Sequence, residues 1–243
     1  MAANRLRVFI TGASSGLGAA LARQYAQQGA MLGLVARRNE VLQELKATLP
    51  NADQHRIYAL DVNDHAALAQ AAADFIQSAQ GIDVVIANAG ISRGTLTEYA
   101  EDLQVFEQVF ATNVTATVAT FSPFIPTMQA QAAAGQTNCR LVGIGSVAGI
   151  RGLPGAGAYS ASKSAVISYC ESLRGELKMS GIKVVTIAPG YIDTPMTQIN
   201  DYAMPFLMPA EKFAASAVAT IDAGCSYRCL LYTSDAADDL LCV

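Results

Sequence analysis

The sequence contains little charge. Only 15% of its 243 residues are Asp, Glu, Lys or Arg, and the formal net charge is -4. Lys and Arg form no cluster, so nothing predicts a nucleic-acid surface or an anionic membrane surface. No apolar stretch reaches the roughly 18 to 20 uncharged residues of a membrane span, and no signal-peptide cleavage site follows the N-terminus. We therefore expect a cytoplasmic protein whose partner is a small molecule.

Histidine is also scarce, and the cysteines lack the spacing of known sites. The five cysteines form no C-x-x-C pair and no zinc-ligand spacing with the two histidines, His55 and His65. We therefore predict core thiols and no metal site. Neither histidine has a nearby nucleophile or metal partner in the sequence, so both are interpreted as solvated loop residues rather than catalytic groups.

Hydrophobic residues, by contrast, make up 52% of the chain, and β-rich apolar runs alternate with helical patterns. The predicted strands are LRVFI, MLGLVA, RIYAL, DVVIAN, CRLVGIGS and KVVTIAP, and the predicted helices cover about 16–28, 39–48, 64–78, 102–134, 159–179 and 210–223. Repeated βαβ units of this kind predict an α/β protein with a doubly wound parallel sheet of the Rossmann type. The length fits a single domain.

The first predicted strand leads into a glycine-rich turn, T-G-x-x-x-G-x-G. Its glycines permit a tight turn and close approach of the backbone, and the free N–H groups at the start of the next helix can bind a pyrophosphate. The turn therefore predicts a dinucleotide site, although any βα turn can need such glycines. The cofactor-binding residues predicted here are Thr11, Gly12, Ser14, Ser15, Gly16, Leu17 and Gly18.

Two arginines follow the second predicted strand, where an NAD enzyme would offer Asp or Glu to the ribose hydroxyls. This chain has Ala36, Arg37 and Arg38 there. Arg37 can form charge-assisted hydrogen bonds to a 2′-phosphate, and Arg38 can stack on adenine or add charge. The sequence therefore favours NADP(H), with NAD as the less favoured cofactor. Two solvated arginines that open a helix are the alternative.

The next two strand ends carry further residues that suit the cofactor. Asp61 and Val62 are predicted to contact the adenine. Asn88, Ala89 and Gly90 form a turn small enough for the cofactor to lie close. All five directly follow a predicted strand, at the edge where ligands of such sheets bind.

A serine at the end of the fifth predicted strand precedes a Tyr and a Lys spaced i and i+4. The spacing puts Tyr159 and Lys163 on one face of a helix. A phenol with a pKa near 10 is a poor acid or base at neutral pH, so a neighbouring ammonium group that stabilises the phenolate makes the tyrosine usable. Ser146 can donate its hydroxyl to the substrate oxygen. A packed tyrosine and a surface lysine are the alternative for this pair alone.

Taken together in this order, the motifs resemble those of the short-chain dehydrogenase/reductase family. They are TGASSGLG, DV at 61–62, NAG at 88–90, Asn113 in FATNVTAT, Ser146, YSASK and PG at 189–190, and the resemblance covers residues 5 to about 228. The glycine spacing is that of the single-domain group. The resemblance implies that Tyr159 is the general acid/base, that Lys163 binds the ribose hydroxyls and lowers the tyrosine pKa, and that Ser146 orients the substrate.

The same resemblance assigns roles to three further segments. Asn113 would hold a water in a proton relay, although a helix-interior Asn that satisfies backbone groups at a kink fits the same position. The segment after the sixth strand would contact the nicotinamide carboxamide, an ordinary Pro-Gly turn being the alternative. Its residues are Pro189, Gly190, Ile192 and Thr194. The apolar segment 197–208 is interpreted as a mobile lid over the substrate, with core packing as the alternative.

The last residues break the pattern of strands and helices. Residues 229–239 match the translation of a widely used transposase sequencing adapter. We therefore assign 1–228 to the dinucleotide-binding domain and interpret 229–243 as a non-native tail that replaces the family's expected last strand. Three aspartates in DAADD disfavour a central strand, so we expect the tail to be disordered or loosely docked. A real short strand followed by an acidic tail is the alternative.

The sequence therefore predicts an NADP-dependent oxidoreductase acting on a carbonyl or secondary alcohol of a moderately apolar small molecule. Two alternatives stay open: a non-catalytic dinucleotide sensor, and a reductase inactivated by its altered ending. The resemblance implies a homodimer through helices 102–134 and 159–179. No stable tetramer is expected, because tetramers of the family commonly use the last helix and strand.

Overall fold

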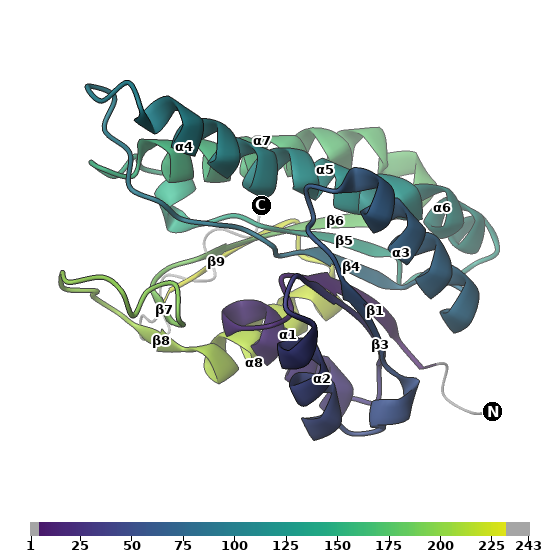
Figure 1. Cartoon of the computed structure of the whole chain (residues 1–243). Coiled ribbons are helices and arrows are strands. Elements are labelled where there is room, and N and C mark those ends of the chain that lie inside the picture. The colour runs from purple at the N-terminus through teal and green to yellow at the C-terminus, as the bar shows by residue number, and fades with distance from the viewer. Residues whose placement is uncertain (1–4, 232–243) are drawn as a thin grey trace.

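The computed structural model describes residues 5–231 and shows a seven-stranded parallel sheet with helices on both faces (Figure 1). The strand order is β3-β2-β1-β4-β5-β6-β9. The strands are β1 (Arg7–Thr11), β2 (Met31–Ala36), β3 (Arg56–Ala59), β4 (Val84–Ala87), β5 (Arg140–Ile144), β6 (Lys183–Pro189) and β9 (Tyr227–Leu230). This confirms the predicted single-domain α/β fold with a doubly wound sheet.

The helices cover the sheet in two layers. Those of the described residues are α1 (Gly16–Gln27), α2 (Asn39–Thr48), α3 (His65–Ala79), α4 (Asp102–Phe110), α5 (Ala116–Phe121), α6 (Ile125–Ala133), α7 (Gly157–Glu176) and α8 (Ala210–Ala223). Helices α1, α2 and α8 lie on one face, and α3 to α7 lie on the other (Figure 1). The short strands β7 (Ile192–Asp193) and β8 (Met208–Pro209) form a separate pair beyond the sheet.

Burial on both faces explains the apolar strands. Successive side chains of a strand point to opposite faces, so in β1 Val8 and Ile10 join the core beneath α1 and α8, while Phe9 joins the core on the other side. The Phe9 ring lies 5.6 Å from the Phe75 ring and 4.8 Å from the Phe124 ring, centroid to centroid. Full burial of such a side chain contributes about 1.5–3 kcal/mol to folding. The sheet is therefore the rigid frame on which the strand ends are placed.

The strand order reverses between β1 and β4. From β1 the chain builds outward through β2 and β3 on one side, and from β4 it builds through β5, β6 and β9 on the other. Crossover loops leave in opposite directions at such a switch point, which opens a crevice at the carboxyl ends of the strands. The crevice is where the predicted site residues should meet.

The stretch predicted as one helix over 102–134 is helical but interrupted. A π-helical turn at Ala111–Thr115 separates α4 from α5, and a short 3-10 turn at Ser122–Phe124 separates α5 from α6. Pro123 and Pro126 have no N–H to donate, which explains the second interruption. The π-helical turn contains Asn113, which is buried and bonds outside its own helix.

The last described strand corrects one expectation. Strand β9 pairs in parallel with β6, from Thr186 opposite Tyr227 to Pro189 opposite Leu230. Cys229 and Leu230, which the sequence-based boundary assigned to the tail, are buried in this strand. A last strand is therefore present, because the apolar start of the tail suits the exposed edge beside β6. The remaining predictions for the tail fall on residues 232–243, outside the described part of the chain.

The histidines and cysteines are only partly as predicted. His65 is exposed at the start of α3, but His55 is 1% exposed, so its prediction as a solvated residue was wrong. The Leu32 N–H donates to Nδ1 of His55 at 3.2 Å, and Nε2 lies 2.9 Å from the Pro50 carbonyl oxygen. Burial lowers the pKa of His55 and favours the neutral ring. Cys139 and Cys170 are buried thiols, as predicted; Cys229 is also buried, and Cys225 is half-buried.

In residues 5–231, no three His, Cys, Asp or Glu side chains gather as a metal site would require. No helix in the same part of the chain is long and apolar enough to cross a membrane.

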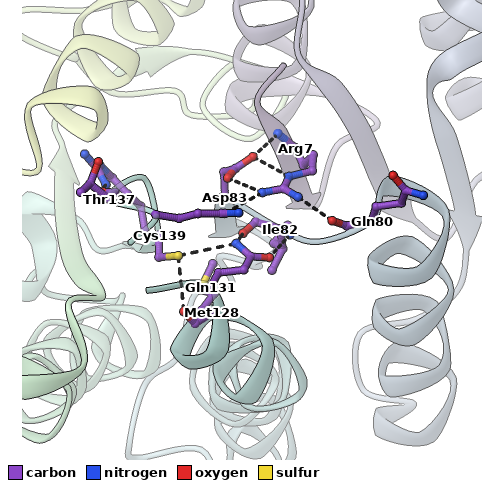
Figure 2. Close-up of polar contacts among 10 residues, drawn as sticks. Arg7, Gln80, Ile82, Asp83, Met128, Gln131, Thr137 and Cys139 are labelled. Carbon is purple, nitrogen blue, oxygen red and sulfur yellow. Dashed lines mark hydrogen bonds and ion pairs between the residues drawn. The ribbon is translucent and has the colours of Figure 1, made fainter. Parts of the chain in front are cut away.

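The amino-terminal edge of the sheet is closed by a polar network (Figure 2). Arg7 at the start of β1 donates from Nε to Oδ2 of Asp83 at 2.8 Å and from Nη2 to Oδ1 at 2.7 Å. Arg7 also donates to the Gln80 carbonyl oxygen. The Gln131 side chain bonds both the N–H and the carbonyl oxygen of Ile82, at 2.9 Å and 2.6 Å. The two buried charges here, on Arg7 and Asp83, therefore neutralise each other, as burial requires.

Candidate active site

A cavity of about 570 Å³ opens at the carboxyl ends of the strands. Its lining comes from the turn between β1 and α1 and from the segments after β2, β3, β4, β5 and β6. Most of the sequence-predicted residues line it: Gly12, Ser14, Ser15, Gly16, Leu17, Arg37, Arg38, Asp61, Val62, Asn88, Ala89, Gly90, Ser146, Tyr159, Lys163, Pro189, Gly190, Ile192 and Thr194. Thr11, Gly18 and Asn113 are not part of the lining and lie behind it.

The glycine-rich turn needs its glycines for two reasons. Gly12 and Gly16 have φ angles of +68° and +53°, which side chains disfavour. A Cβ atom on Gly12 would lie 2.8 Å from Cα of Ala89, and one on Gly18 would lie 2.2 Å from the Gly12 carbonyl oxygen. The turn thus packs directly against the segment after β4 and leaves a cradle that added Cβ atoms would disrupt.

Thr11 holds this turn against the neighbouring strand. Its Oγ1 accepts hydrogen bonds from the backbone N–H groups of Asn88 and Ala89, both at 3.1 Å. The Asn88 side chain donates back to the carbonyl oxygens of Thr11 and Gly12, at 2.9 Å and 3.2 Å. Asn88 therefore joins the turn after β1 to the turn after β4, in addition to lining the cavity.

The first turn of α1 offers donors to an anion. Ser15 precedes the helix, no side chain caps it, and the first turn contains no acidic residue. The N–H groups at this end are therefore free to bind a negative group, and the helix dipole favours one there. The glycine cradle and this helix end together fit the pyrophosphate of a dinucleotide.

The two arginines after β2 border the same cavity. Arg38 donates from Nη2 to Oγ of Ser14 at 3.2 Å, which ties it to the glycine-rich turn. Arg37 is exposed, and its Nη1 lies 4.0 Å from Oδ2 of Asp61. Oδ1 of Asp61 accepts from the backbone N–H of Asn63 at 2.9 Å. Both guanidinium groups can therefore reach an anion at this end of the cavity.

Tyr159 and Lys163 lie one turn apart on α7, as predicted. The Lys163 Nζ lies 5.8 Å from the centroid of the Tyr159 ring and donates to the Ile144 carbonyl oxygen at 2.8 Å. Only 6% of Lys163 is exposed. Burial lowers the pKa of Lys163 to about 8, because removal from water disfavours the ammonium form. No carboxylate within residues 5–231 forms a salt bridge with it.

Tyr159 shares its wall of the cavity with Ser146. Burial raises the pKa of the Tyr159 phenol, a hydrogen bond to Ser146 opposes that rise, and the nearby Tyr202 adds to it. Ser146 follows β5, and its Oγ accepts from the Ala148 N–H at 3.1 Å. The arrangement offers a protonated phenol and a serine hydroxyl to one small region, which is what protonation of a carbonyl oxygen requires.

Asn113 makes three bonds behind the cavity. Its Oδ1 accepts from the Ile91 N–H at 2.8 Å, and its Nδ2 donates to the Ile91 carbonyl oxygen at 3.0 Å. Nδ2 also donates to Oγ of Ser162 at 2.9 Å. The side chain does satisfy backbone groups at a kink, but they belong to the segment after β4 and not to its own helix.

The segment after β6 closes the cavity beside the glycine-rich turn. A Cβ atom on Gly16 would lie 3.3 Å from Cβ of Thr194, so the two segments touch. Thr197 fixes the turn, because its Oγ1 donates to the Ile192 carbonyl oxygen at 2.6 Å and accepts from the Thr194 N–H at 3.1 Å. These hydrogen bonds fix residues 192–197, which an ordinary Pro-Gly turn at 189–190 would not do.

The predicted lid segment presents apolar side chains to solvent. Ile199 is 80% exposed, Phe206 is 59% exposed and Tyr202 is 53% exposed, so they do not pack in the core. Met208 is the exception, because it is buried in β8. Met196, just before the segment, lines the cavity. An exposed apolar flap beside the cavity suits contact with an apolar substrate.

Sequence reasoning missed several residues of the site. Ile91 and Asn63 directly follow predicted site residues at strand ends, so extending that rule by one or two positions would have found them. Arg93 lines the cavity from the loop before α4 and Thr112 from the π-helical turn after it, and no local pattern marks them. Ser162 lies inside the YSASK motif but had no role assigned.

Comparison with known families and curated proteins gives consistent relatives. The family model for short chain dehydrogenase matches residues 7–203. An uncharacterized oxidoreductase of Mycobacterium tuberculosis is 41% identical over 201 residues, which cover 79% of this chain and 76% of that protein. The sulfoacetaldehyde reductase of Chromohalobacter salexigens is 34% identical over 193 residues, which cover 79% and 75% of the two chains.

Solved structures agree in fold. A short-chain dehydrogenase from Streptomyces avermitilis superposes with a TM-score of 0.82 at 25% identity, covering 93% of this chain and 88% of that one. A 3-ketoacyl-(acyl-carrier-protein) reductase from Brucella melitensis, solved with NADH, gives the same TM-score at 24% identity, covering 90% and 92%. This second likeness supports the fold alone.

Proposed function

Because the chain belongs to the short-chain dehydrogenase family, whose members are oxidoreductases, we propose that it transfers a hydride between NADP(H) and a carbonyl or secondary alcohol of a moderately apolar small molecule. The observation that carries this proposal is the meeting of Tyr159, Lys163 and Ser146 on the wall of the cavity into which the glycine-rich turn opens. A dinucleotide sensor would need the turn but not the acid/base pair.

The cofactor, when bound, supplies or accepts the hydride. Its pyrophosphate would be held by the glycine-rich turn and the start of α1, from Gly12 to Gly18. Arg37 and Arg38 would bind the 2′-phosphate, because they offer charge-assisted donors where an NAD enzyme has a carboxylate. Asp61, Val62 and the turn at 88–90 would contact the adenosine. Pro189, Gly190, Ile192 and Thr194 would hold the nicotinamide carboxamide.

The surroundings of Tyr159 suit it as the donor of the proton that the substrate oxygen receives. Burial raises its pKa, so the phenol holds its proton at neutral pH and can donate it to a carbonyl oxygen. Lys163 has a pKa of about 8, so it is mostly an ammonium at pH 7 and stabilises the phenolate that remains. Ser146 would donate its hydroxyl to the same substrate oxygen. Asn113 would hold a water of the proton relay, and its Oδ1 and the Lys163 Nζ both lie close to Gly90.

The assembly that we propose is a homodimer through α4 and α7. These helices pack side by side on one face of the sheet (Figure 1). On α4, Leu103 is 63% exposed, and the exposed Phe106 stacks on Phe110 with ring centroids 4.7 Å apart. Apolar side chains of this kind suit a helix from a second copy. Light scattering after size-exclusion chromatography tests the state, and a monomer or a stable tetramer would contradict it.

The location that we propose is the cytoplasm, because the unpaired thiols of Cys139 and Cys170 suit a reducing compartment.

The direct test of the function is oxidation of NADPH in the presence of a panel of aldehydes and ketones. The loss of NADPH absorbance measures the rate of turnover. The same series with NADH measures the cofactor preference. We expect turnover with at least one apolar carbonyl and faster reaction with NADPH. Cofactor binding without turnover across the panel would favour the sensor.

A further inference from the structure

Ser162 is a fully buried hydroxyl near the start of α7, the helix that carries Tyr159 and Lys163. It lies on α7 between Tyr159 and Lys163, has no exposed surface and does not line the cavity. Its Oγ donates to the Tyr159 carbonyl oxygen at 2.7 Å and accepts from Nδ2 of Asn113 at 2.9 Å. This one hydroxyl therefore joins α7 to the π-helical turn at Ala111–Thr115.

The three partners of the Asn113 amide, Ser162 and the two backbone groups of Ile91, all require the same orientation. The single proton of the Ser162 hydroxyl is committed to the Tyr159 carbonyl, so its oxygen can only accept from Asn113. Nδ2 therefore faces Ser162, and the backbone of Ile91 requires the same orientation, because its N–H donates to Oδ1 and its carbonyl oxygen accepts from Nδ2. A reversed amide would place two donors together at Ile91 N and two acceptors together at Ser162.

The position of the Asn113 side chain matters because Asn113 holds the turn at 88–91 beside Lys163. Asn113 bonds both polar backbone groups of Ile91, and Ile91 lines the cavity. A Cβ atom on Gly90 would lie 3.2 Å from Oδ1 of Asn113 and 3.5 Å from Nζ of Lys163. The Asn113 amide and the Lys163 ammonium thus both lie close to Gly90. Displacement of the amide would move the turn at 88–91 and change the space around the Lys163 ammonium.

We propose that Ser162 is a positioning residue that acts through Asn113. It anchors the Asn113 amide to α7 as a third partner beside the two Ile91 backbone groups, and Asn113 in turn holds the turn at 88–91 against Lys163. The kinetic part of this inference rests on the proposed function, whereas the structural part does not.

The kinetic test is a double-mutant cycle. Ser162→Ala should lower kcat about tenfold with little change in the KM for NADPH, because the cradle at the start of α1 is untouched. Ser164→Ala, at an exposed position of the same helix, should leave kcat unchanged. In an Asn113→Ala background, Ser162→Ala should lower kcat no further. An unchanged kcat in the single variant, or the same tenfold loss in both backgrounds, would overturn the proposal.

A readout without turnover keeps the inference separate from the function. Hydrogen exchange of the Ile91 amide, followed by NMR, should be faster in Ser162→Ala than in the wild type and unchanged in Ser164→Ala, because the Ile91 N–H is bonded to Asn113. If no carbonyl is turned over, the proposed function fails and this measurement alone decides. Equal Ile91 exchange in Ser162→Ala and the wild type would overturn the positioning role.

Discussion

Two buried cations lie at opposite ends of the sheet in opposite surroundings. Arg7, at the amino-terminal edge, makes a bidentate pair with Asp83, and this hydrogen-bonded carboxylate raises the pKa of Arg7. Lys163, at the carboxyl edge, donates to the neutral carbonyl oxygen of Ile144, and burial lowers its pKa to about 8. The fold therefore neutralises charge where it only needs to close the sheet, and leaves charge uncompensated where chemistry is expected.

The same contrast holds for the backbone at the two edges. At the amino-terminal edge the Gln131 side chain satisfies the polar groups of Ile82 (Figure 2). At the carboxyl edge the start of α1 has no side-chain cap, and glycines keep the approach to it open. Unpaired N–H groups at the start of a helix lower stability unless a ligand or water bonds to them, and functional sites commonly carry this cost.

The strongest test of the carboxyl edge is Tyr159→Phe. The ring and its packing remain, but the transferable proton is lost, so kcat should fall by up to about 10⁴-fold. The dissociation constant of NADPH, measured by fluorescence titration, should change less than about threefold. Near wild-type kcat in this variant would show that the assigned mechanism is wrong.

The matching test of the amino-terminal edge is Asp83→Ala. It leaves the Arg7 guanidinium buried without its carboxylate, which should lower the free energy of unfolding by about 3–5 kcal/mol. Urea denaturation measures this loss. Below the denaturation transition, kcat per folded molecule should match the wild type. Asp53→Ala, at an exposed position, should change stability by less than about 0.5 kcal/mol. A large loss of kcat in folded Asp83→Ala would break the division between the two edges.

The arginines at the cavity give a smaller effect confined to one cofactor. Arg37→Asp with Arg38→Ala should weaken NADPH binding by roughly 1.5–3 kcal/mol, because charge-assisted bonds to the 2′-phosphate are lost. NADH binding should change little, since it lacks that phosphate. Titration of both cofactors against both proteins measures the preference, and an unchanged ratio of affinities would refute the assignment.

The last test concerns the stability cost of Lys163, which shows itself only as a dependence on pH. Below pH 8 the Lys163 amine is protonated in both the folded and the unfolded state, so the folded protein bears the whole cost of burying the charge. Between pH 8 and the unfolded value of 10.5, the unfolded chain binds more protons, so stability rises with pH. The stability advantage of Lys163→Met over the wild type, measured in urea, should therefore be largest below pH 8 and shrink toward pH 10.5. The exposed Lys178→Met should show no such trend.

Local patterns in the sequence were sufficient for much of the fold. The six strands LRVFI to KVVTIAP were predicted because burial on both faces of a parallel sheet demands continuous apolar runs. The positions of Tyr159 and Lys163 on one helix face follow from the helical repeat, which is a property of a few neighbouring residues. The glycine-rich turn was recognisable because its backbone angles and close contacts exclude side chains.

Interactions between distant residues were decided only by the tertiary structure. Arg7 meets Asp83 across 76 positions, and Asn113 meets Ser162 across 49. The burial of His55 and the pairing of Cys229 in β9 likewise depend on where other strands lie. The sequence by itself determined which residues could form strands, helices and the cofactor turn. The tertiary structure decided which charges are neutralised and which hydroxyl anchors Asn113, because hydrogen bonds and burial depend on distance in space and not on distance along the chain.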